Sequence, residues 1–155
     1  MEIYSRNPFA ASGLQTDWVQ ENQSLSEKKG TVRGLHFQTP PFAQTKLVRA
    51  IQGEILDVFV DLRKDSTTYG EWEAIHLSAE NAKAVYVPRG FAHGFCTLSE
   101  NTIIQYKVDN PYSPEHDSGI RWNDPDLRIN WETNAPILSA KDEILPFFKD
   151  FVSPF

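Results

Sequence analysis

Residues 46–62 have the sequence KLVRAIQGEILDVFVDL, in which two strand-length runs of apolar and β-branched residues, Lys46–Ile51 and Glu54–Leu62, flank Gln52-Gly53. Runs of this length and composition between turn residues predict β-strands. The same pattern recurs along the chain and predicts further strands over Glu71–Leu77, Ala84–Val87, Phe95–Leu98 and Thr102–Val108. Many short strands separated by regular turns are typical of a β-sandwich or β-barrel. The sequence does not show the alternation of helices and strands that would indicate a parallel α/β sheet.

The amino-terminal region contains the signals of one short helix. Asn7 is a suitable helix cap, Pro8 suits the first helical position and Gly13 suits the stop. We therefore predict a helix over Pro8–Ser12. The following segment, Trp18–Ser24, is expected to be extended.

The carboxyl-terminal region has a different composition. After residue 110 the chain is rich in Pro, Asp and Asn, which predicts ordered loops over a β scaffold. Ser139 and Asp142 have the spacing of a capping box and predict a short terminal helix. Because the sequence contains neither internal repeats nor a linker, we expect residues 1–155 to form a single domain.

The overall composition limits the class of protein. The chain has 155 residues, of which 40% are hydrophobic, and a formal net charge of -6, so we do not expect nonspecific binding to nucleic acid. A local basic cluster can still hold a phosphorylated small molecule. The lone Cys96 excludes an internal disulfide and is expected to be a buried small hydrophobe. No apolar run approaches the ~20 residues of a membrane span and no signal-peptide pattern is present, so a cytoplasmic enzyme or binding domain is expected.

Three side chains in this β-rich sequence suit proton transfer beside a carbonyl group: His36, Lys46 and Tyr106. An imidazole titrates at about pH 6.5 and can act as a general base, an ammonium can stabilise a developing enolate oxygen, and a phenol with a pKa of about 10 can return a proton. Each residue also has a plainer interpretation. His36 can be bonded to backbone at the edge of the core, Lys46 can be solvated and Tyr106 can simply be packed.

The arrangement of these groups depends on Gly34. Alternation along a strand puts His36 on the face of Gly34 and Gln38, and puts Arg33 on the opposite face. Arg33 and His36 can line one cavity only if Gly34 forms a β-bulge, as glycine within a strand often does. Asp142 also has two interpretations, as a helix cap or as the carboxylate that orients an imidazole, and its two oxygens allow both roles.

Two histidines on a β-barrel raise the question of a metal site. His93 lies between two phenylalanines at strand parity, but the sequence contains no His-x-His, and His76 and His116 lack companions. A metal site needs three or four converging ligands. No metal or other cofactor is therefore expected.

Five longer segments resemble motifs of one family, and they are GTVRGLHFQ (30–38), GEILDV (53–58), PRGFAHGF (88–95), GIRW (119–122) and LSAKD (138–142). Over almost the entire chain, the sequence resembles the dTDP-4-dehydrorhamnose 3,5-epimerases, which are cupin-type sugar-nucleotide enzymes. The resemblance implies a metal-free jelly-roll β-barrel with short peripheral helices, which forms a homodimer through exchanged amino-terminal strands. It also implies a dTDP-linked 4-keto-6-deoxyhexose as substrate, namely dTDP-4-dehydro-6-deoxy-D-glucose, inverted at carbons 3 and 5.

The resemblance implies four catalytic residues by their place in these motifs. His36 would remove the proton beside the ketone, with Asp142 as its partner. Lys46 would stabilise the enolate at the carbon-4 oxygen. Tyr106 would deliver a proton to the opposite face of the sugar.

Substrate contacts are implied for Glu2, Gln20, Glu21, Asn22, Arg33, His93, Tyr112, Asp117 and Lys141. Among these, Arg33 would lie near the diphosphate and Tyr112 would stack on thymine. Glu2 matches a glutamate that members of the family contribute to the site of the neighbouring subunit.

The sequence departs from the family pattern in three places. It begins inside that pattern, without the Asp-x-Arg-Gly-Phe-Phe segment that supplies an arginine to the partner's diphosphate, so we expect weakened nucleotide binding. Gln23 stands where a histidine is common. Asp117 stands where a glutamate is usual, which shortens the reach of a sugar or base contact.

Three other functions stay open at this point. The protein could invert only one of the two carbons of a related deoxysugar nucleotide, could be a catalytically impaired nucleotide-sugar binding module, or could be a metal-using cupin. A pure binding module needs no acid–base pair, so the set formed by His36, Lys46, Tyr106 and Asp142 argues against the second option.

Overall fold

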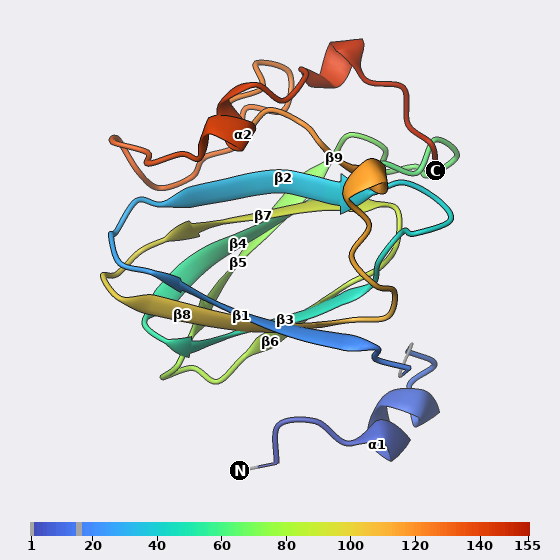
Figure 1. The fold of residues 1–155 in the computed structure, drawn as a ribbon, viewed down its shortest axis with the longest axis vertical. Coiled ribbons are helices and arrows are strands. Elements are labelled where there is room, and N and C mark those ends of the chain that lie inside the picture. Colours follow the sequence, from blue (N-terminus) through green and yellow to red (C-terminus); the bar gives the residue numbers. More distant parts are fainter. Residues whose placement is uncertain (1, 15–16) are drawn as a thin grey trace.

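The computed structural model describes residues 2–14 and 17–155. In that part of the chain nine strands form two antiparallel sheets, one with the order β1-β8-β3-β6 and one with the order β5-β4-β7-β2-β9 (Figure 1). The strands are β1 Gln20–Ser26, β2 Val32–Gln38, β3 Lys46–Gln52, β4 Glu54–Asp61, β5 Trp72–Ser78, β6 Ala84–Val87, β7 Phe91–Thr97, β8 Thr102–Val108 and β9 Asp117–Gly119. The predicted all-β class is confirmed.

The helices are short and peripheral (Figure 1). They are α1 Arg6–Ala11, α2 Ala140–Glu143 and the 3-10 turns η1 Pro114–His116 and η2 Phe148–Asp150. Within the described ranges, no helix has the length and apolar character to cross a membrane.

The predicted start and cap of the first helix are wrong. Helix α1 begins at Arg6 and its cap position is Ser5, whose side chain makes no capping hydrogen bond. Pro8 is still compatible with the helix, because the amide groups of a first turn have no partner inside the helix and a missing N–H costs little there. Gly13 follows the helix with a positive φ of 73°, as a stop residue should.

Two predicted strands, Ala84–Val87 and Thr102–Val108, match the structure at both ends. Strand β7 instead begins at Phe91, four residues before the predicted Phe95. The early residues of β7 include Ala, His and Gly, which have weak strand preference, but β7 pairs with β4 on one side and β2 on the other. Pairing on both edges therefore overrides local preference.

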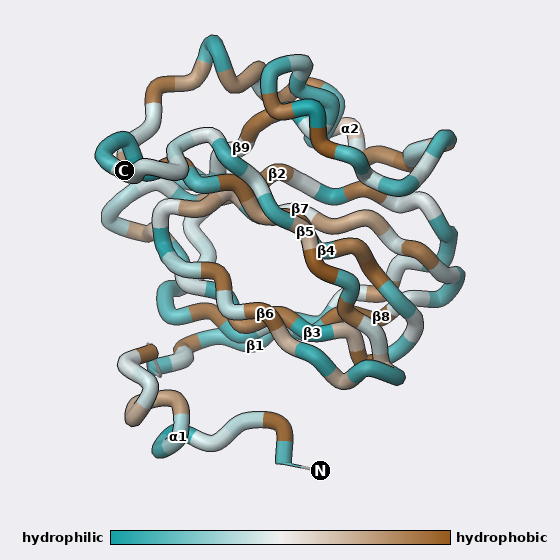
Figure 2. Tube along the Cα trace, turned by 180° about the vertical axis from the view of Figure 1, so that it is seen from behind, coloured by the Kyte–Doolittle hydropathy of each residue, from teal (hydrophilic) through white to brown (hydrophobic). Residues whose placement is uncertain are grey.

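The five-stranded sheet packs on both faces. One face covers Val58, Cys96 and Ile120 together with Trp131 from the carboxyl-terminal region. The other face meets the four-stranded sheet through a smaller cluster, Val48, Ala50, Ile55, Leu77, Phe95 and Ile104. Strand β4 is hydrophobic along much of its length because it contributes to both layers (Figure 2).

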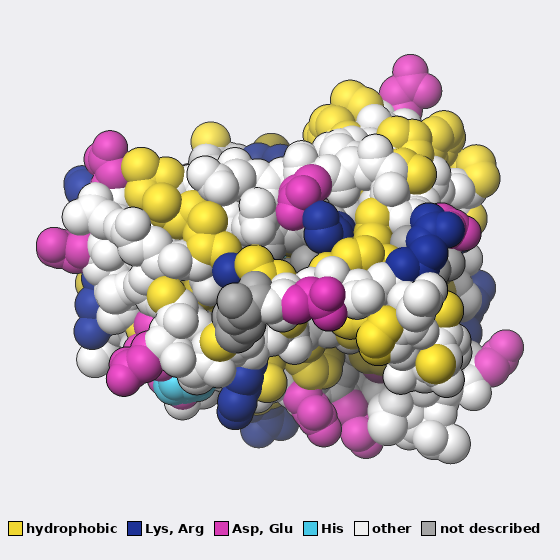
Figure 3. All heavy atoms as spheres, turned by 90° about the horizontal axis from the view of Figure 1, so that it is seen from below, with side chains coloured by type: hydrophobic (Ala, Val, Ile, Leu, Met, Phe, Trp, Pro, Cys, Tyr) yellow, Lys and Arg dark blue, Asp and Glu magenta, His cyan; other side chains and the backbone are white. Residues whose placement is uncertain are grey.

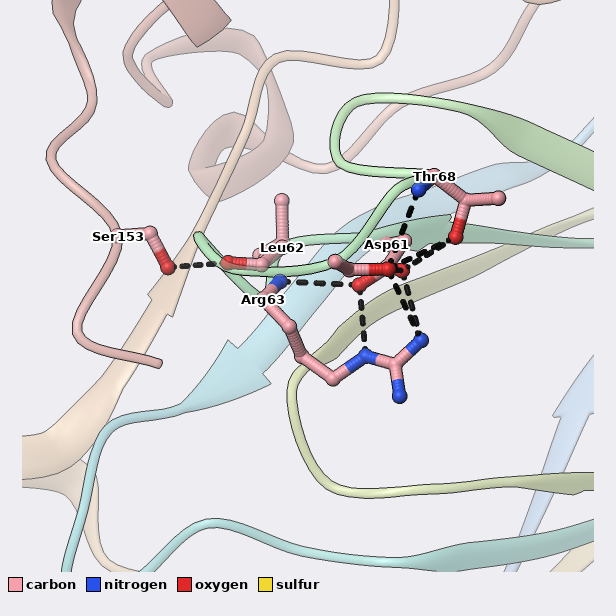
Figure 4. Close-up of polar contacts among 6 residues, drawn as sticks. Asp61, Leu62, Arg63, Thr68 and Ser153 are labelled. Atoms are coloured by element: carbon pink, nitrogen blue, oxygen red, sulfur yellow. Dashed lines mark hydrogen bonds and ion pairs between the residues drawn. The ribbon is translucent and has the colours of Figure 1, made fainter.

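A buried carboxylate organises the turn after β4. Asp61 accepts hydrogen bonds from the backbone and guanidinium of Arg63 and from the hydroxyls of Ser66 and Thr68 (Figure 4). Burial acts to raise the pKa of Asp61, but these bonds outweigh it and hold that pKa well below its usual range. Beside it, the Ser153 hydroxyl donates to the Leu62 carbonyl and ties the carboxyl-terminal segment to the end of β4.

Gly34 forms the β-bulge that the sequence predicted. The pairing of β2 with β7 shifts register between Arg33 and His36. At Gly34 φ is +125°, and a Cβ there would lie 2.6 Å from the Gly94 Cα and 2.9 Å from the His93 carbonyl oxygen. Only glycine allows the two backbones to approach this closely.

We predict that Gly34→Ala destabilises the fold far more than Gly13→Ala. Both positions have positive φ, but a Cβ at Gly13 meets no atom within 4 Å. Gly13→Ala should therefore cost about 1 kcal/mol of unfolding free energy from backbone strain alone, whereas Gly34→Ala adds a clash with backbone atoms. Urea unfolding measures both costs, and equal losses for the two variants would contradict the close approach of β2 and β7.

Candidate active site

A cavity of about 290 Å³ lies between the two sheets. Strands of the five-stranded sheet contribute Arg33, His36 and His93, and strands of the four-stranded sheet contribute Lys46 and Tyr106. The bulge at Gly34 brings Arg33 and His36 to the same cavity, as the sequence required. These predicted residues, which span more than 70 positions in the chain, therefore meet in one place.

His36 is paired with a buried carboxylate. Its Nε2 lies 2.5 Å from Oδ1 of Asp142, and the two side chains are 27% and 0% exposed. Burial acts to raise the pKa of Asp142, but hydrogen bonds from His36 and Ser139 outweigh it and lower that pKa to about 2. An ionised carboxylate only accepts hydrogen bonds, so the proton in this contact belongs to Nε2, and Nδ1 is the nitrogen that can take another proton.

Asp142 contacts both the helix cap and the imidazole, as the sequence allowed, but its carboxylate reaches the cap through the Ser139 hydroxyl. Its backbone N–H donates to the Ser139 hydroxyl, which caps helix α2, and the Ser139 hydroxyl lies 2.5 Å from Oδ2. Its other oxygen, Oδ1, accepts from His36 and from the Gly34 backbone N–H at 3.2 Å. Oδ2 thus holds the hydroxyl that caps the helix and Oδ1 holds the imidazole, so both contacts coexist.

Among the described residues, Lys46 is one of two cations that line the cavity, together with Arg33. Burial lowers the pKa of Lys46 to about 8, although the negative charges of Asp57 and Asp117 act to raise it. A lysine tuned in this way keeps its charge at neutral pH and loses it in mildly alkaline solution. Such a group can stabilise negative charge that develops on a substrate oxygen.

Tyr106 faces the same cavity from β8, across from the sheet that holds His36. Burial raises the pKa of Tyr106, and the charge of Asp117 adds to this effect. The phenol therefore stays protonated over the physiological range and is available as a proton donor.

The structure shows one buried partner that the sequence analysis did not assign. Asp57 on β4 is fully buried and its Oδ2 lies 2.8 Å from Nε2 of His93. Its other oxygen, Oδ1, has no hydrogen-bond partner among the described residues. The available signal was the charge itself, because an aspartate in the middle of the apolar run 54–62 is costly to bury without a use.

Three predicted substrate contacts form a second cluster beside the cavity. The Tyr112 hydroxyl donates to Oδ2 of Asp117 at 2.9 Å, and the Lys141 ammonium bonds the same oxygen. The hydrogen bond to Asp117 raises the pKa of Tyr112. Asp117 and Lys141 also lie close enough to Lys46 to influence its pKa.

The remaining predicted contacts are divided between the two faces of the four-stranded sheet. Gln20 bonds Asn22 and also accepts from the Tyr112 backbone N–H at 3.2 Å, so these two residues lie on the Tyr112 side. Glu21 pairs with Lys107 at 2.9 Å and lines a different cavity on the outer face. Glu2 also lies on the outer face and is not brought to the cavity of its own chain.

The described residues contain no cluster of three or more His, Cys, Asp or Glu side chains arranged to hold a metal ion. In the cavity His36 and His93 each direct Nε2 at a carboxylate oxygen.

Comparison with known proteins identifies the family of this chain. The family model of dTDP-4-dehydrorhamnose 3,5-epimerase matches residues 1–150. This chain belongs to that family. A dTDP-4-dehydrorhamnose 3,5-epimerase of Sinorhizobium fredii is 50% identical over 146 residues, which cover 94% of this chain and 75% of that protein. The predicted resemblance is therefore confirmed.

A solved epimerase of the family has the same fold. The structure of dTDP-4-dehydrorhamnose 3,5-epimerase from Bacillus anthracis, with TDP and PPi bound, matches with a TM-score of 0.93 and 53% identity, covering 95% of this chain and 84% of that chain. The predicted cupin-like jelly-roll fold is thereby confirmed. A more distant relative, dTDP-4-dehydrorhamnose 3-epimerase of Streptomyces niveus, is 39% identical over 92% of this chain and 69% of that protein.

For this family member we predict that epimerase activity falls as pH rises through about 8. The lowered pKa of Lys46 means that the ammonium is lost there, and with it the stabilisation of the developing oxyanion. The measurement is kcat/KM against pH. Lys46→Arg should retain part of the activity, and the alkaline fall in its plot of kcat/KM against pH should move above pH 10, since a guanidinium stays charged. An unchanged alkaline fall in Lys46→Arg would assign the titration to another group.

Proposed function

We propose that this chain acts as one epimerase domain that inverts carbons 3 and 5 of dTDP-4-dehydro-6-deoxy-D-glucose and forms dTDP-4-dehydro-L-rhamnose. The observation that carries the proposal is the meeting of His36 and Tyr106 in one cavity from two facing sheets. Inversion requires a base on one side of a carbon and an acid on the other. An imidazole and a phenol on opposite walls are suited to that task.

The chemistry follows from the acidity of protons next to a ketone. His36 takes the proton from the carbon, and the electron pair moves into the ketone to form an enolate at carbon 4. Lys46 stabilises the negative oxygen, and Asp142 stabilises the imidazolium that His36 becomes. Tyr106 then gives a proton to the opposite face of the carbon. Both carbons flank the same ketone, so one set of groups serves both inversions.

Binding of the anionic nucleotide is supported by the local charge. The chain has a net charge of -6, yet Arg33 and Lys46 both line this cavity. Arg33 would contact the diphosphate, His93 the sugar, and Tyr112 would offer its ring to the thymine base. Gln20 and Asp117 bond Tyr112, Asn22 bonds Gln20 and Lys141 bonds Asp117, and these four residues are assigned to nucleotide and sugar contacts.

We predict that the protein incubated with its 4-keto sugar nucleotide in deuterated water incorporates deuterium at carbons 3 and 5. Each proton returned by Tyr106 comes from solvent, so each inversion leaves one label. NMR or mass spectrometry of the product measures both positions. Nucleotide binding without any exchange would contradict catalysis and would support a pure binding module.

Label at only one carbon would favour a second candidate function, a single-carbon epimerase. The specific observation behind this candidate is the 39% identical Streptomyces niveus relative, which is named a 3-epimerase. The higher identity to a 3,5-epimerase favours inversion at both carbons.

We predict different outcomes for the base and the acid in the same exchange assay. His36→Ala should reduce exchange by about 100-fold or more, because no base remains to remove the proton. Tyr106→Phe should retain some exchange through return of the proton to the same face, but should impair inversion. His76→Ala and Tyr69→Phe are matched controls on exposed positions and should behave like the wild type. Equal loss of exchange and inversion in Tyr106→Phe would contradict its assignment as the acid.

A homodimer is part of the proposal, and the outer face of the four-stranded sheet supports it. A cavity of about 350 Å³ opens there, partly lined by Ile3, Leu47 and Arg49. One guanidinium nitrogen of Arg49 is buried without a hydrogen-bond partner in the described chain. Apolar, basic and acidic side chains lie together on the face that carries α1 (Figure 3). Glu2 lies on this face, away from its own cavity, and would serve the partner's site.

We predict a solution mass of about twice 17.7 kDa by light scattering. Arg49→Glu should shift the protein toward the monomer, because a buried carboxylate replaces a donor that needs an acceptor from the partner. Lys64→Glu makes the same change of charge at an exposed loop position and should leave the mass unchanged. A monomeric wild type at all concentrations would contradict the dimer.

A further inference from the structure

Gln38 has no role in the reaction described above, yet its side chain makes a full set of hydrogen bonds. It lies two residues after His36 on β2 and is only 4% exposed. Its Nε2 donates to the Phe42 carbonyl at 2.7 Å and to the Pro111 carbonyl at 3.1 Å, and its Oε1 accepts from the Ser113 N–H at 2.7 Å. Both amide hydrogens and the amide oxygen are therefore used, all on backbone groups.

Two of these hydrogen bonds lie on either side of Tyr112. Pro111 and Ser113 are its neighbours in the chain, so the Gln38 carboxamide fixes the backbone before and after the ring. The Tyr112 N–H is bonded to Gln20 and the Tyr112 hydroxyl to Asp117. The residue itself is 55% exposed.

An exposed ring on a rigid backbone is suited to stacking. A tyrosine in a loop without such anchors must be ordered when a ligand binds, and the loss of conformational freedom lowers affinity. Anchors that are already formed remove that cost. Stacking of a base on an aromatic ring also tolerates no large tilt, so the position of the loop matters as well as its order.

The loop has a second support at its other end. Asn110 donates to the Pro41 and Ala43 carbonyls, and Gln44 donates to the Asn110 carbonyl. These contacts hold residue 110 against the 40–44 loop but do not reach residues 111–113. After the ring, the Ser113 carbonyl also accepts from the His116 N–H at 3.1 Å. Gln38 is the side chain that bonds the backbone both before and after the ring.

We infer that Gln38 is a positioning residue that presets the Tyr112 ring for stacking on the nucleobase of the substrate. This inference rests on the proposed function, in which Tyr112 meets the base. It goes further by assigning two functions to one strand. Strand β2 carries His36, the proposed base, and two residues later Gln38, which fixes the ring that would stack on the nucleobase. The distance between base recognition and the reacting carbons is then set by β2.

Two variants of Gln38 separate this role from general stability. Gln38→Glu keeps the shape but loses both donors, and it turns a carboxylate oxygen toward the carbonyls of Phe42 and Pro111. Gln38→Met removes all three hydrogen bonds without burying a charge and carries the test if Gln38→Glu does not fold. Gln52→Glu is the matched control, because the Gln52 Nε2 also donates to a backbone carbonyl, that of Asn101 at 2.7 Å, in the β3–β4 region.

The test compares binding of dTDP with binding of inorganic pyrophosphate by calorimetry, together with kcat and KM. The Gln38 variants should bind dTDP about tenfold more weakly and raise KM, while pyrophosphate affinity and kcat change by less than about twofold. Gln52→Glu should match the wild type. In a Tyr112→Ala background Gln38→Met should add no further loss of dTDP affinity, since its effect passes through the ring.

Two results would overturn the inference. Parallel loss of dTDP and pyrophosphate affinity would show a general disturbance of the fold, and unchanged dTDP affinity in Gln38→Met would show that the ring needs no such support. Tyr112→Ala separates a failure of the proposed nucleobase contact from a failure of the Gln38 role. If it leaves dTDP affinity unchanged, the nucleobase role of Tyr112 fails and the Gln38 inference fails with it. If it weakens dTDP and the Gln38 variants do not, only the Gln38 inference fails.

Discussion

The buried carboxylate of Asp142 is the contact on which the site depends. One oxygen accepts from His36 and from the Gly34 backbone, and the other lies against the Ser139 hydroxyl of the helix cap. A fully buried carboxylate stays charged only when donors surround it, so bulge, imidazole and cap must be in place together. The hydrogen bonds that attach the carboxyl-terminal helix to β2 are therefore the same ones that orient the His36 imidazole, which we propose as the base. Fold stability and the orientation of this imidazole depend on one set of atoms.

The second constraint is the gap between the two sheets. It is closed at one end by apolar residues such as Ile55 and Ile104, and it holds polar groups from both sheets in its open part. His36 and Tyr106 stand on separate rigid sheets, so their separation does not depend on a loop. Burial in the same space lowers the pKa of Lys46 and raises that of Tyr106. The same desolvated environment thus makes the Lys46 ammonium lose its proton more easily and keeps the Tyr106 phenol protonated.

Hydrogen bonds inside the chain also hold the residues that we propose for nucleotide binding. Gln20 and Asp117, which the sequence assigned to substrate contacts, both bond Tyr112. Gln38 holds the backbone around the same ring. These contacts form a continuous path from the Tyr112 ring through β2 to His36. The Tyr112 ring and the His36 imidazole, the proposed base, are consequently parts of one network rather than independent features.

The amino-acid sequence was sufficient to predict the all-β class, the strands Ala84–Val87 and Thr102–Val108, and the five titratable residues that line the cavity in the described part of the chain, because periodicity and motifs are written in neighbouring residues. The three-dimensional arrangement was needed to show that Arg33 and His36 share a cavity, since strand parity alone put them on opposite faces until the register with β7 was known. It also decided the pairing of Asp57 with His93 and the early start of β7. Register, burial and the choice of partner for a charge arise from contacts between distant residues, and local sequence carries no direct record of them.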